Sequence, residues 1–411
     1  MRYSGNMNSH SQKKEKQPVY IRAFPALNGD CILISYTKEQ NHHLLIDCGY
    51  ADTYKNHLKK HLQEMGKRNE RLDRFIITHI DSDHINGAVP LLKEAGDHIQ
   101  IDQVWHNSYR HIQTEHPAVI SANSSAQERI FQQIKNRGYK TENPTGPAEI
   151  AAWHGTTVGA LLLKGKYSWN TDFNEQAVSI ENKQTVAIAE AVNIYLLSPD
   201  SKKLQKLEKV WKEELEKLGL DYSKNNEELF DDAFEMMLSW EKEHITPVEK
   251  TITASKPGVD ELLKTQFKED TTATNGSSIA FILEIQDKRL LLLGDSHPSL
   301  IESSLQKYQP DGKIYFDLIK VSHHGSYANT SPSLLAKIDS PVYLISTNGQ
   351  GHGHPDIATI AHIISRPSSF ERVIYFNYKT ANAEYFNNSE WKKKYNYSIK
   401  YLDNDPFTII V

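Results

Sequence analysis

The sequence of 411 residues predicts a layered α/β sandwich, in which two sheets lie between outer helices. Short apolar runs of strand length alternate with segments of helical spacing in both halves of the chain. No apolar run is long enough to span a bilayer, and no short internal repeat occurs. The hydrophobic fraction of 38% and the net charge of −5 fit a folded protein with a charged surface.

The N-terminal half begins with three expected strands, VYIRAF, CILISY and HLLIDCG, which turn residues separate. A helix is expected over residues 52–68, because Tyr54, Leu58 and Leu62 fall on one stripe. The other elements expected in this half are strands at 74–78, 103–106 and 185–197, and helices at 87–96, 124–136 and 150–163.

A charged helical segment then interrupts the strands. It begins after Ser198-Pro199-Asp200, reads KKLQKLEKVWKEELEKLGL, and is expected to be followed by a helix at 226–242. We interpret residues 201–270 as a helical insertion or cap, between a first half at 19–200 and a second half at 271–411, with a disordered tail at 1–18. The later expected elements are strands at 278–285, 289–293, 316–321, 342–346, 373–377 and 407–411, and helices ending at 305 and spanning 356–364.

Charge and cysteine content limit the class of protein. A slightly acidic balance does not indicate a nucleic-acid-binding face, and the basic runs at 13–16, 202–209 and 392–394 are typical of solvated surfaces. The two cysteines, Cys31 and Cys48, lie in apolar stretches, which favours small buried side chains and a reducing compartment. The N-terminus lacks the apolar region of a signal peptide, so we expect a cytoplasmic protein with no membrane association.

The strongest chemical signal is the segment THIDSDHING. It places four side chains of metal-ligand type within six residues, directly after an expected strand: His79, Asp81, Asp83 and His84. Imidazole nitrogens and carboxylate oxygens are the donors that divalent cations such as zinc and manganese bind. A polar loop with histidines by chance is the alternative, and the density of the motif disfavours it.

Four further polar clusters lie at the ends of apolar runs or before a helix. They are Asp47 in LIDCG, Asp295 in LLLGD, the pair His323 and His324 in SHHGS, and His354 in GHGHP. Either aspartate by itself would favour a turn or a helix cap. The repeated placement at strand ends instead indicates one shared site.

The order LIDCG, HxDxDH, LLLGD and HHGS resembles the metallo-β-lactamase superfamily. More narrowly, NGDCILI, TNGSSIAFIL and KVSHHGS resemble the branch that contains the metallohydrolase domain of bacterial DNA-uptake competence proteins and their stand-alone relatives. The resemblance covers residues 19–364. It implies a metallo-β-lactamase αββα four-layer sandwich with a helical insertion, and metal-dependent hydrolysis.

The resemblance also implies roles for single residues. His79, Asp81, Asp83 and His84 match the central metal motif, Asp295 matches a bridging ligand, and either His323 or His324 matches the last histidine ligand. Asp47 matches an aspartate that braces the ligand loop, and Ser326 and His354 match positions near the mouth of the site. Most members have histidine at the position of Asp81, and a further ligand histidine where this chain has Asn275. The site is therefore rich in oxygen, and one or two ions of Zn²⁺, Mn²⁺ or Mg²⁺ are expected.

The expected reaction is hydrolysis by metal-activated water, with Asp83 orienting the nucleophile or acting as base. His324 or His354 would donate a proton or stabilise an oxyanion, and a helix start at Ser326 or Asp356 would help to bind phosphate. The resemblance and the carboxylate-rich site favour a phosphodiester in nucleic acid or a nucleotide. Trp105-His106 and Trp153-His154 either line a pocket for a base or pack in the core.

Two other functions remain open at this point. One is hydrolysis of another ester class on the same site, such as a lactone, a thioester or a phosphate monoester. The other is a non-catalytic module that binds a protein partner through the helical insertion. Stand-alone relatives in the resembling branch occur in multi-gene bacterial systems, including antiviral defence, which would suit a protein partner. The sequence leaves the oligomeric state open.

Overall fold

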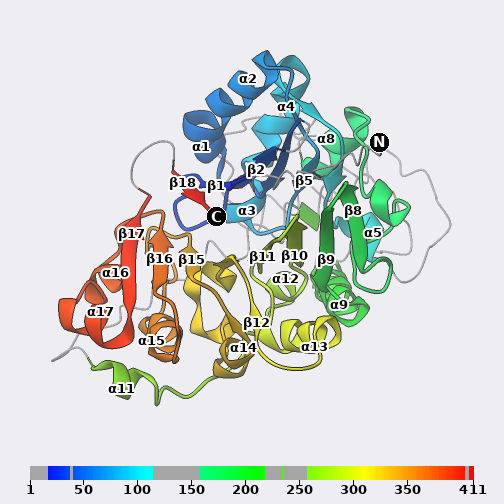
Figure 1. Cartoon of the computed structure of the whole chain (residues 1–411). Coiled ribbons are helices and arrows are strands. Elements are labelled where there is room, and N and C mark those ends of the chain that lie inside the picture. The colour runs from blue at the N-terminus through cyan, green and yellow to red at the C-terminus, as the bar shows by residue number, and fades with distance from the viewer. Residues whose placement is uncertain (1–16, 38–39, 114–156, 218–233, 236–256, 403–406) are drawn as a thin grey trace, which may run out of the picture.

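The computed structural model describes residues 17–37, 40–113, 157–217, 234–235, 257–402 and 407–411 (Figure 1). Four expected segments lie wholly or partly outside these residues: residues 1–16 of the tail expected at 1–18, the helix expected at 124–136, residues 150–156 of the helix expected at 150–163, and most of the helix expected at 226–242. In the described residues, no helix has both the length and the apolar character needed to cross a bilayer.

The first sheet has six strands in the order β18-β1-β2-β3-β5-β7. The predicted antiparallel start is confirmed, because β1 pairs with β2 and β2 with β3 in antiparallel register, whereas β3, β5 and β7 run parallel. The bounds are β1 Val19–Ala23, β2 Ile32–Thr37, β3 Asn41–Ile46, β5 Arg74–Ile76, β7 Val104–Trp105 and β18 Thr408–Ile410.

The second sheet has eight strands in the order β17-β16-β15-β13-β11-β10-β9-β8. The bounds are β8 Thr185–Ala189, β9 Val192–Ser198, β10 Ala280–Ile285, β11 Lys288–Leu292, β13 Leu318–Lys320, β15 Val342–Ile345, β16 Arg372–Phe376 and β17 Tyr397–Tyr401. The single strand predicted at 185–197 is wrong. The chain turns back at Glu190-Ala191, where Ala191 has a φ of 58°, and forms an antiparallel hairpin. Two short ribbons complete the pairing: β4 (Arg71–Leu72) with β6 (Gln100–Ile101), and β12 (Ile314–Tyr315) with β14 (Ile338–Asp339).

Apolar side chains from both sheets form a core between them, including Ile34, Ile46, Phe281 and Leu292. Helices cover the outer faces, and Figure 1 shows α2 and α4 on one side and α13, α14 and α15 on the opposite side. The αββα layering predicted from the sequence is therefore confirmed. The helical segments over the first sheet are α1 Ala51–Thr53, η1 Tyr54–Leu58, α2 Lys59–Lys67, α4 Ala88–His98 and α8 Val158–Lys164. Those over the second are α11 Val259–Leu262, α13 Pro298–Tyr308, α14 Pro332–Lys337, α15 Ile357–Ser365, α16 Ala381–Tyr385 and α17 Ser389–Tyr395.

Helix α4 continues two residues beyond the predicted end at Gly96, because an exposed glycine does not by itself stop a helix. The short segments α3 (Ser82–Ile85), α5 (Tyr109–Ile112), η2 (Thr171–Phe173), α12 (Ala273–Gly276), η4 (Ser322–Gly325) and η5 (Tyr327–Asn329) lie in the connections.

Each sheet takes strands from both halves of the chain. Strands β8 and β9 precede residue 200 but belong to the second sheet, and β18 returns from the C-terminus to pair with β1. The described part of the predicted insertion includes α9 (Ser201–Lys217), which packs on α5 and α12. Its Trp211 is fully buried and contacts the rings of Tyr109 and Phe234. Helix α9 is therefore joined to the sandwich.

Candidate metal centre

The polar segments predicted to form one site follow the carboxyl ends of parallel strands. His79 and Asp81 follow β5, and Asp295 follows β11. His323 and His324 follow β13 in a turn where both have positive φ, of 44° and 54°. Gly294 permits the sharp exit from β11, because its φ is 49° and a Cβ there would lie 2.4 Å from Ser278 Oγ. The two sheets thus present their ligand loops to one another.

Four imidazole rings converge on one carboxylate oxygen, Asp295 Oδ2. The distances from Nε2 to this oxygen are 3.5 Å for His84, 3.7 Å for His79, 3.7 Å for His324 and 3.8 Å for His323. Donor atoms of His79, His84 and Asp295 all lie within 4.8 Å of one another, close enough to bind one cation. The structure therefore brings together both histidines that the sequence could not separate.

The Nδ1 atoms of three of these rings face acceptors outside the centre. His84 Nδ1 donates to Asp47 Oδ2 at 2.8 Å, and His324 Nδ1 donates to the Ser346 carbonyl at 2.9 Å. The Thr78 hydroxyl donates a hydrogen bond to Asp47 Oδ2. Its oxygen, Oγ1, is therefore the acceptor for His79 Nδ1, at 2.9 Å. Each ring is thereby fixed as the tautomer whose Nε2 lone pair points to the centre.

Asp47 holds this arrangement from beneath. Its Oδ1 accepts the Thr78 amide at 2.7 Å, in addition to the two bonds at Oδ2, and it is fully buried. The sequence placed Asp47 as a brace for the ligand loop, and the structure puts it in contact with both the loop and the His84 ring.

Two further carboxylates border the centre. Asp81 Oδ2 lies 3.2 Å from His79 Nε2, and Asp83 Oδ2 lies 3.3 Å from His324 Nε2. Asp83 also accepts from Asn28 Nδ2 at 3.1 Å. The side chain of Asp83 is 16% exposed whereas that of Asp295 is 2% exposed, so Asp83 lies on the open side of the centre.

The electrostatics are those of a cation site. Burial alone would lower the pKa of His84, but the charges of Asp295 and Asp47 outweigh it and raise that pKa well above its ordinary value. Burial alone would raise the pKa of Asp295, but the His84 and His324 imidazoles hold it well below its usual range. The pKa of Asp83 is lowered for the same reason, against its burial. The carboxylates thus stay ionised and attract positive charge.

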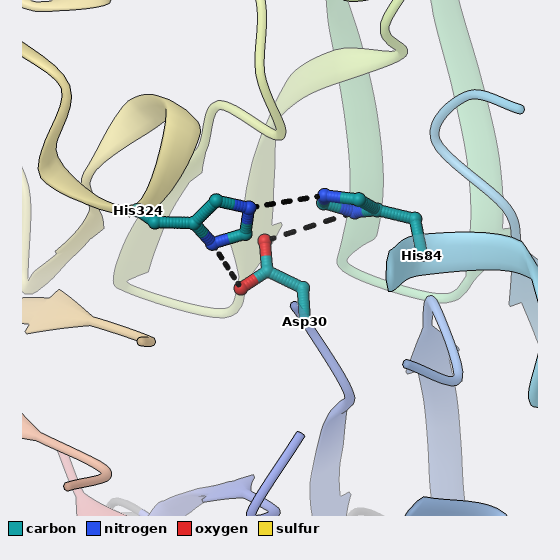
Figure 2. A group of neighbouring side chains, drawn as sticks. All are labelled: Asp30, His84 and His324. Atoms are coloured by element: carbon teal, nitrogen blue, oxygen red, sulfur yellow. Dashed lines mark hydrogen bonds and ion pairs between the residues drawn. The ribbon is translucent and has the colours of Figure 1, made fainter. Parts of the chain in front are cut away.

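Sequence reasoning missed Asp30, which is buried beneath the centre. Its carboxylate forms an ion pair with the ammonium of Lys320, and both side chains are fully enclosed. Figure 2 shows Asp30 between His84 and His324, from segments far apart in the sequence. The signal for Asp30 was its place in the NGDCILI segment, just before β2. The turn that contains Gly29 and Asp30 approaches α3 closely. A Cβ on Gly29 would lie only 1.8 Å from the Asp83 carbonyl oxygen.

Asp30, His84 and His324 are also close enough to hold an ion, but their chemistry makes this a poor site. The Nδ1 atoms that face Asp30, at 4.0 Å and 3.7 Å, already donate to Asp47 and Ser346. The Lys320 ammonium also neutralises the carboxylate. We therefore place the centre on the Nε2 side, around Asp295, and regard Asp30 as an outer support.

The remaining predicted residues lie around the centre. His354 is half-buried, and its ring centroid is 5.0 Å from that of His323. Asn275 donates to Asp270 at 2.6 Å and lies beside His323. Ser326 is buried in the turn after His324, and its backbone hydrogen-bonds to His323 and Asn329.

The aromatic pocket predicted as one alternative at Trp105-His106 is wrong, because both side chains are fully buried. Trp105 Nε1 donates to Asp172, and His106 Nε2 lies 2.9 Å from the buried carboxylate of Glu235. These two residues therefore pack in the core. Trp153 and His154 lie outside the described residues. Helix η5 after Ser326 has only three residues. Asp356 occupies the N-cap position of α15, and its side chain accepts the Tyr327 amide at 2.8 Å.

The donor set fits a divalent cation. Among the described residues, Asp295 Oδ1 is buried and has no hydrogen-bond partner, while its Oδ2 faces four imidazoles. An unpaired buried carboxylate oxygen is unfavourable unless a cation completes its surroundings. Three carboxylates and four imidazole nitrogens around one point suit Zn²⁺ or Mn²⁺, and the donors suffice for one or two ions.

Part of the chain matches a known protein-family model. Residues 25–159 match the family model described as the metallo-beta-lactamase superfamily, a range that includes His79, Asp81, Asp83 and His84. The chain is also similar to the crystal structure of the metallo-beta-lactamase fold protein YhfI from Bacillus subtilis, with 11% identity, a TM-score of 0.39, and coverage of 96% of this chain and 100% of that one. No curated protein matches the sequence. The family model and the αββα architecture show that the chain contains a metallo-β-lactamase-fold domain of the α+β class.

Proposed function

We propose that this chain is a metal-dependent hydrolase whose substrate is a phosphodiester, in nucleic acid or a nucleotide. The observation that carries the proposal is the convergence of four Nε2 atoms on Asp295 Oδ2, with three carboxylates around the same point. Sites of this composition bind divalent cations. The family model over residues 25–159 supports the same chemistry.

A divalent cation bound here supplies Lewis acidity and lowers the pKa of water, which makes a hydrolytic nucleophile available near neutral pH. His79, Asp81, Asp83, His84, Asp295, His323 and His324 would hold it. Asp83 is suited to orient the nucleophile, because it is the partly exposed carboxylate and its lowered pKa keeps it an acceptor. Asn28 fixes the Asp83 carboxylate from the open side.

His354 is suited to act on the leaving group. Its ring lies at the edge of the centre beside His323, and its Nδ1 is 3.7 Å from Asp356 Oδ2. An imidazole in this position can donate a proton to a departing alkoxide. His324 is less suited to this role, since its Nδ1 donates to Ser346 and its Nε2 faces the carboxylates.

The substrate class follows from charge. A phosphodiester carries one negative charge and develops more in the transition state, and a bound cation with hydrogen-bond donors beside it stabilises that charge. A carboxylate-rich donor set also suits Mn²⁺ and Mg²⁺, which favour phosphate oxygens. The resemblance of NGDCILI and KVSHHGS to the DNA-uptake branch supports the same substrate.

The test is a substrate panel with purified protein under Mn²⁺, Zn²⁺ and Mg²⁺. The panel holds single- and double-stranded DNA, RNA, cyclic nucleotides and bis-p-nitrophenyl phosphate, with a lactone, a thioester and a phosphate monoester beside them. We expect phosphodiester cleavage that Asp83→Ala and His84→Ala abolish. Asp311→Ala, in an exposed turn before β12, is the matched control and should retain full activity.

Three outcomes would contradict the proposal. Turnover of an ester but of no phosphodiester would exclude the nuclease and phosphodiesterase activity. Activity that survives both Asp83→Ala and His84→Ala would exclude this centre. A protein that binds none of the three metals and cleaves nothing would favour a non-catalytic, partner-binding role.

A further inference from the structure

Asn329 lies behind the candidate metal centre, at the end of η5, and is 1% exposed. Its amide makes three contacts. Oδ1 is 2.8 Å from His323 Nδ1, and Nδ2 is 3.0 Å from Asp270 Oδ2 and 3.0 Å from the Asp295 carbonyl oxygen. One side chain therefore contacts two of the residues assigned to the centre and a carboxylate outside it.

Two of these contacts determine the orientation of the amide. A carboxylate and a backbone carbonyl only accept hydrogen bonds, so the nitrogen of Asn329 must face Asp270 and Asp295. Its oxygen must then face His323, and the Nδ1 of His323 must carry the proton. The lone pair of His323 is thereby left on Nε2, the atom that lies 3.8 Å from Asp295 Oδ2.

Asn275 holds Asp270 and does not hold His323. Its Nδ2 donates to Asp270 Oδ2 at 2.6 Å and also lies 3.4 Å from His323 Nδ1. In the arrangement that Asn329 imposes, Asn275 Nδ2 and His323 Nδ1 are both donors. Their contact at 3.4 Å is therefore not a hydrogen bond. The residue that stands where the resemblance implies a ligand histidine thus supports the carboxylate that orients Asn329.

We propose that Asn329 and Asp270 are positioning residues, which hold His323 as the tautomer that binds metal through Nε2. This inference rests on the proposed metal centre. The adjacent histidines then supply two imidazoles from one turn, each held from behind by a different acceptor. His324 is held by the Ser346 carbonyl beside Asp83 and His84, and His323 is held by Asn329 on the side of Asn275.

Asp270 is itself held in the ionised state that this role requires. The Thr272 amide donates to its Oδ1 at 2.8 Å, and His297 Nε2 lies 3.6 Å from its Oδ2. Lys203 Nζ, from α9, lies 2.7 Å from the other nitrogen of His297. Burial alone would raise the pKa of Asp270, but His297 and these donors lower it well below its ordinary value. A polar chain therefore connects α9, in the predicted insertion, to the centre.

The experiment compares metal binding by three single variants of the full chain. Asn329→Leu keeps the number and branching of the side-chain heavy atoms but removes the amide, and Asp270→Ala removes the acceptor that orients it. Asn107→Ala is the control, since Asn107 is also buried and makes two hydrogen bonds, both to the Val178 backbone. Calorimetric titration with Zn²⁺ and with Mn²⁺ should show affinity weakened about 10–100-fold in the first two variants and unchanged in the control.

A second readout separates positioning from general loosening of the fold. Histidine-selective ¹⁵N labelling of the zinc-loaded protein reports which ring nitrogen carries the proton, and His323→Gln assigns the signal. We expect a protonated Nδ1 at His323 in the wild type and loss of that signal in Asn329→Leu.

The outcomes distinguish this inference from the proposed function. If the wild type binds metal and both variants have the same metal affinity and the same His323 signal, the inference is overturned and the proposed function is unaffected. Wild-type protein that binds no metal would overturn the function first. If Asn329→Leu does not fold, Asp270→Ala with the same two measurements decides the matter.

Discussion

At the scale of single residues, the centre depends on hydrogen bonds that point away from it. Asp47, Thr78 and Ser346 each face an Nδ1 atom, and each leaves an Nε2 lone pair toward Asp295. A ring with the opposite tautomer would present an N–H to the cation. The acceptors behind the rings therefore matter nearly as much as the ligands themselves.

Asp47→Asn tests this directly. With its oxygen toward the Thr78 amide, the new amide would place an NH₂ group against His84 Nδ1, which drives His84 to the tautomer without an Nε2 lone pair. Asn also tolerates the positive φ of 54° at this position, so the fold should survive. We expect metal affinity to fall about 10–100-fold, measured by calorimetry with circular dichroism as the folding control. Unchanged affinity would show that Asp47 does not orient His84.

At the scale of elements, a buried carboxylate on β14 joins this strand to β16 of the second sheet and to the end of α15. Asp339 accepts from Arg372 of β16 at 3.0 Å and 2.7 Å, and Arg366, at the end of α15, lies 3.3 Å away. Asp339 and Arg372 are both fully buried. Removing one partner of such a pair leaves an uncompensated charge in the interior.

We therefore expect Asp339→Asn to lower the free energy of unfolding by about 3–5 kcal/mol at neutral pH. Asp311→Asn, on the exposed turn before β12, should change it little. Chemical denaturation measures both. A loss below about 1 kcal/mol would show that the ion pair does not fix these elements.

The pH dependence of this contribution has a definite sign. Burial alone would raise the pKa of Asp339, but hydrogen bonds from Arg372 and the charge of Arg366 hold it below its ordinary value. A folded-state pKa below the unfolded one, about 3.9, contributes stability that is present above that value and is lost as pH falls through the folded pKa. The difference in the free energy of unfolding between wild type and Asp339→Asn should therefore become smaller below about pH 4. A difference that stays constant down to acid unfolding would contradict this assignment.

At the scale of the whole molecule, the centre lies where two sheets meet. His79, Asp83 and His84 come from the first sheet, and Asp295, His323 and His324 come from the second. Negative charge from both sides is concentrated there, balanced in part by Lys320. A cation that binds this place stabilises the packing of the sheets and is not bound by the unfolded chain as a preformed site.

Metal removal should thus destabilise the entire fold. We expect a divalent cation at a hundredfold excess over its dissociation constant to add about 2.7 kcal/mol to the free energy of unfolding, and a chelator to remove that increment. Thermal unfolding with and without chelator measures the effect. His84→Ala should unfold at the same temperature in both conditions, and a metal-dependent shift that persists in this variant would place the cation elsewhere.

Much of the architecture could be predicted from the sequence because it depends on local pattern. Strand-length apolar runs, helical spacing and the HIDSDH cluster depend on neighbours along the chain, and the αββα layering follows from their order. The hairpin at Ala191 could not be predicted, since one residue with positive φ decides between one long strand and two. The pairing of β18 with β1 joins residues at opposite ends of the chain, which no local pattern encodes.

The sequence by itself determined the donor types and their order: a cluster of His79, Asp81, Asp83 and His84, then Asp295, then two adjacent histidines. Only the tertiary structure decided what each atom faces. It placed both His323 and His324 toward Asp295, enclosed Asp30 with Lys320 beneath the centre, and set Asn329 behind His323. The physical reason is that a ligand is defined by the direction of a lone pair, and that direction is fixed by hydrogen bonds from residues that are distant in the sequence.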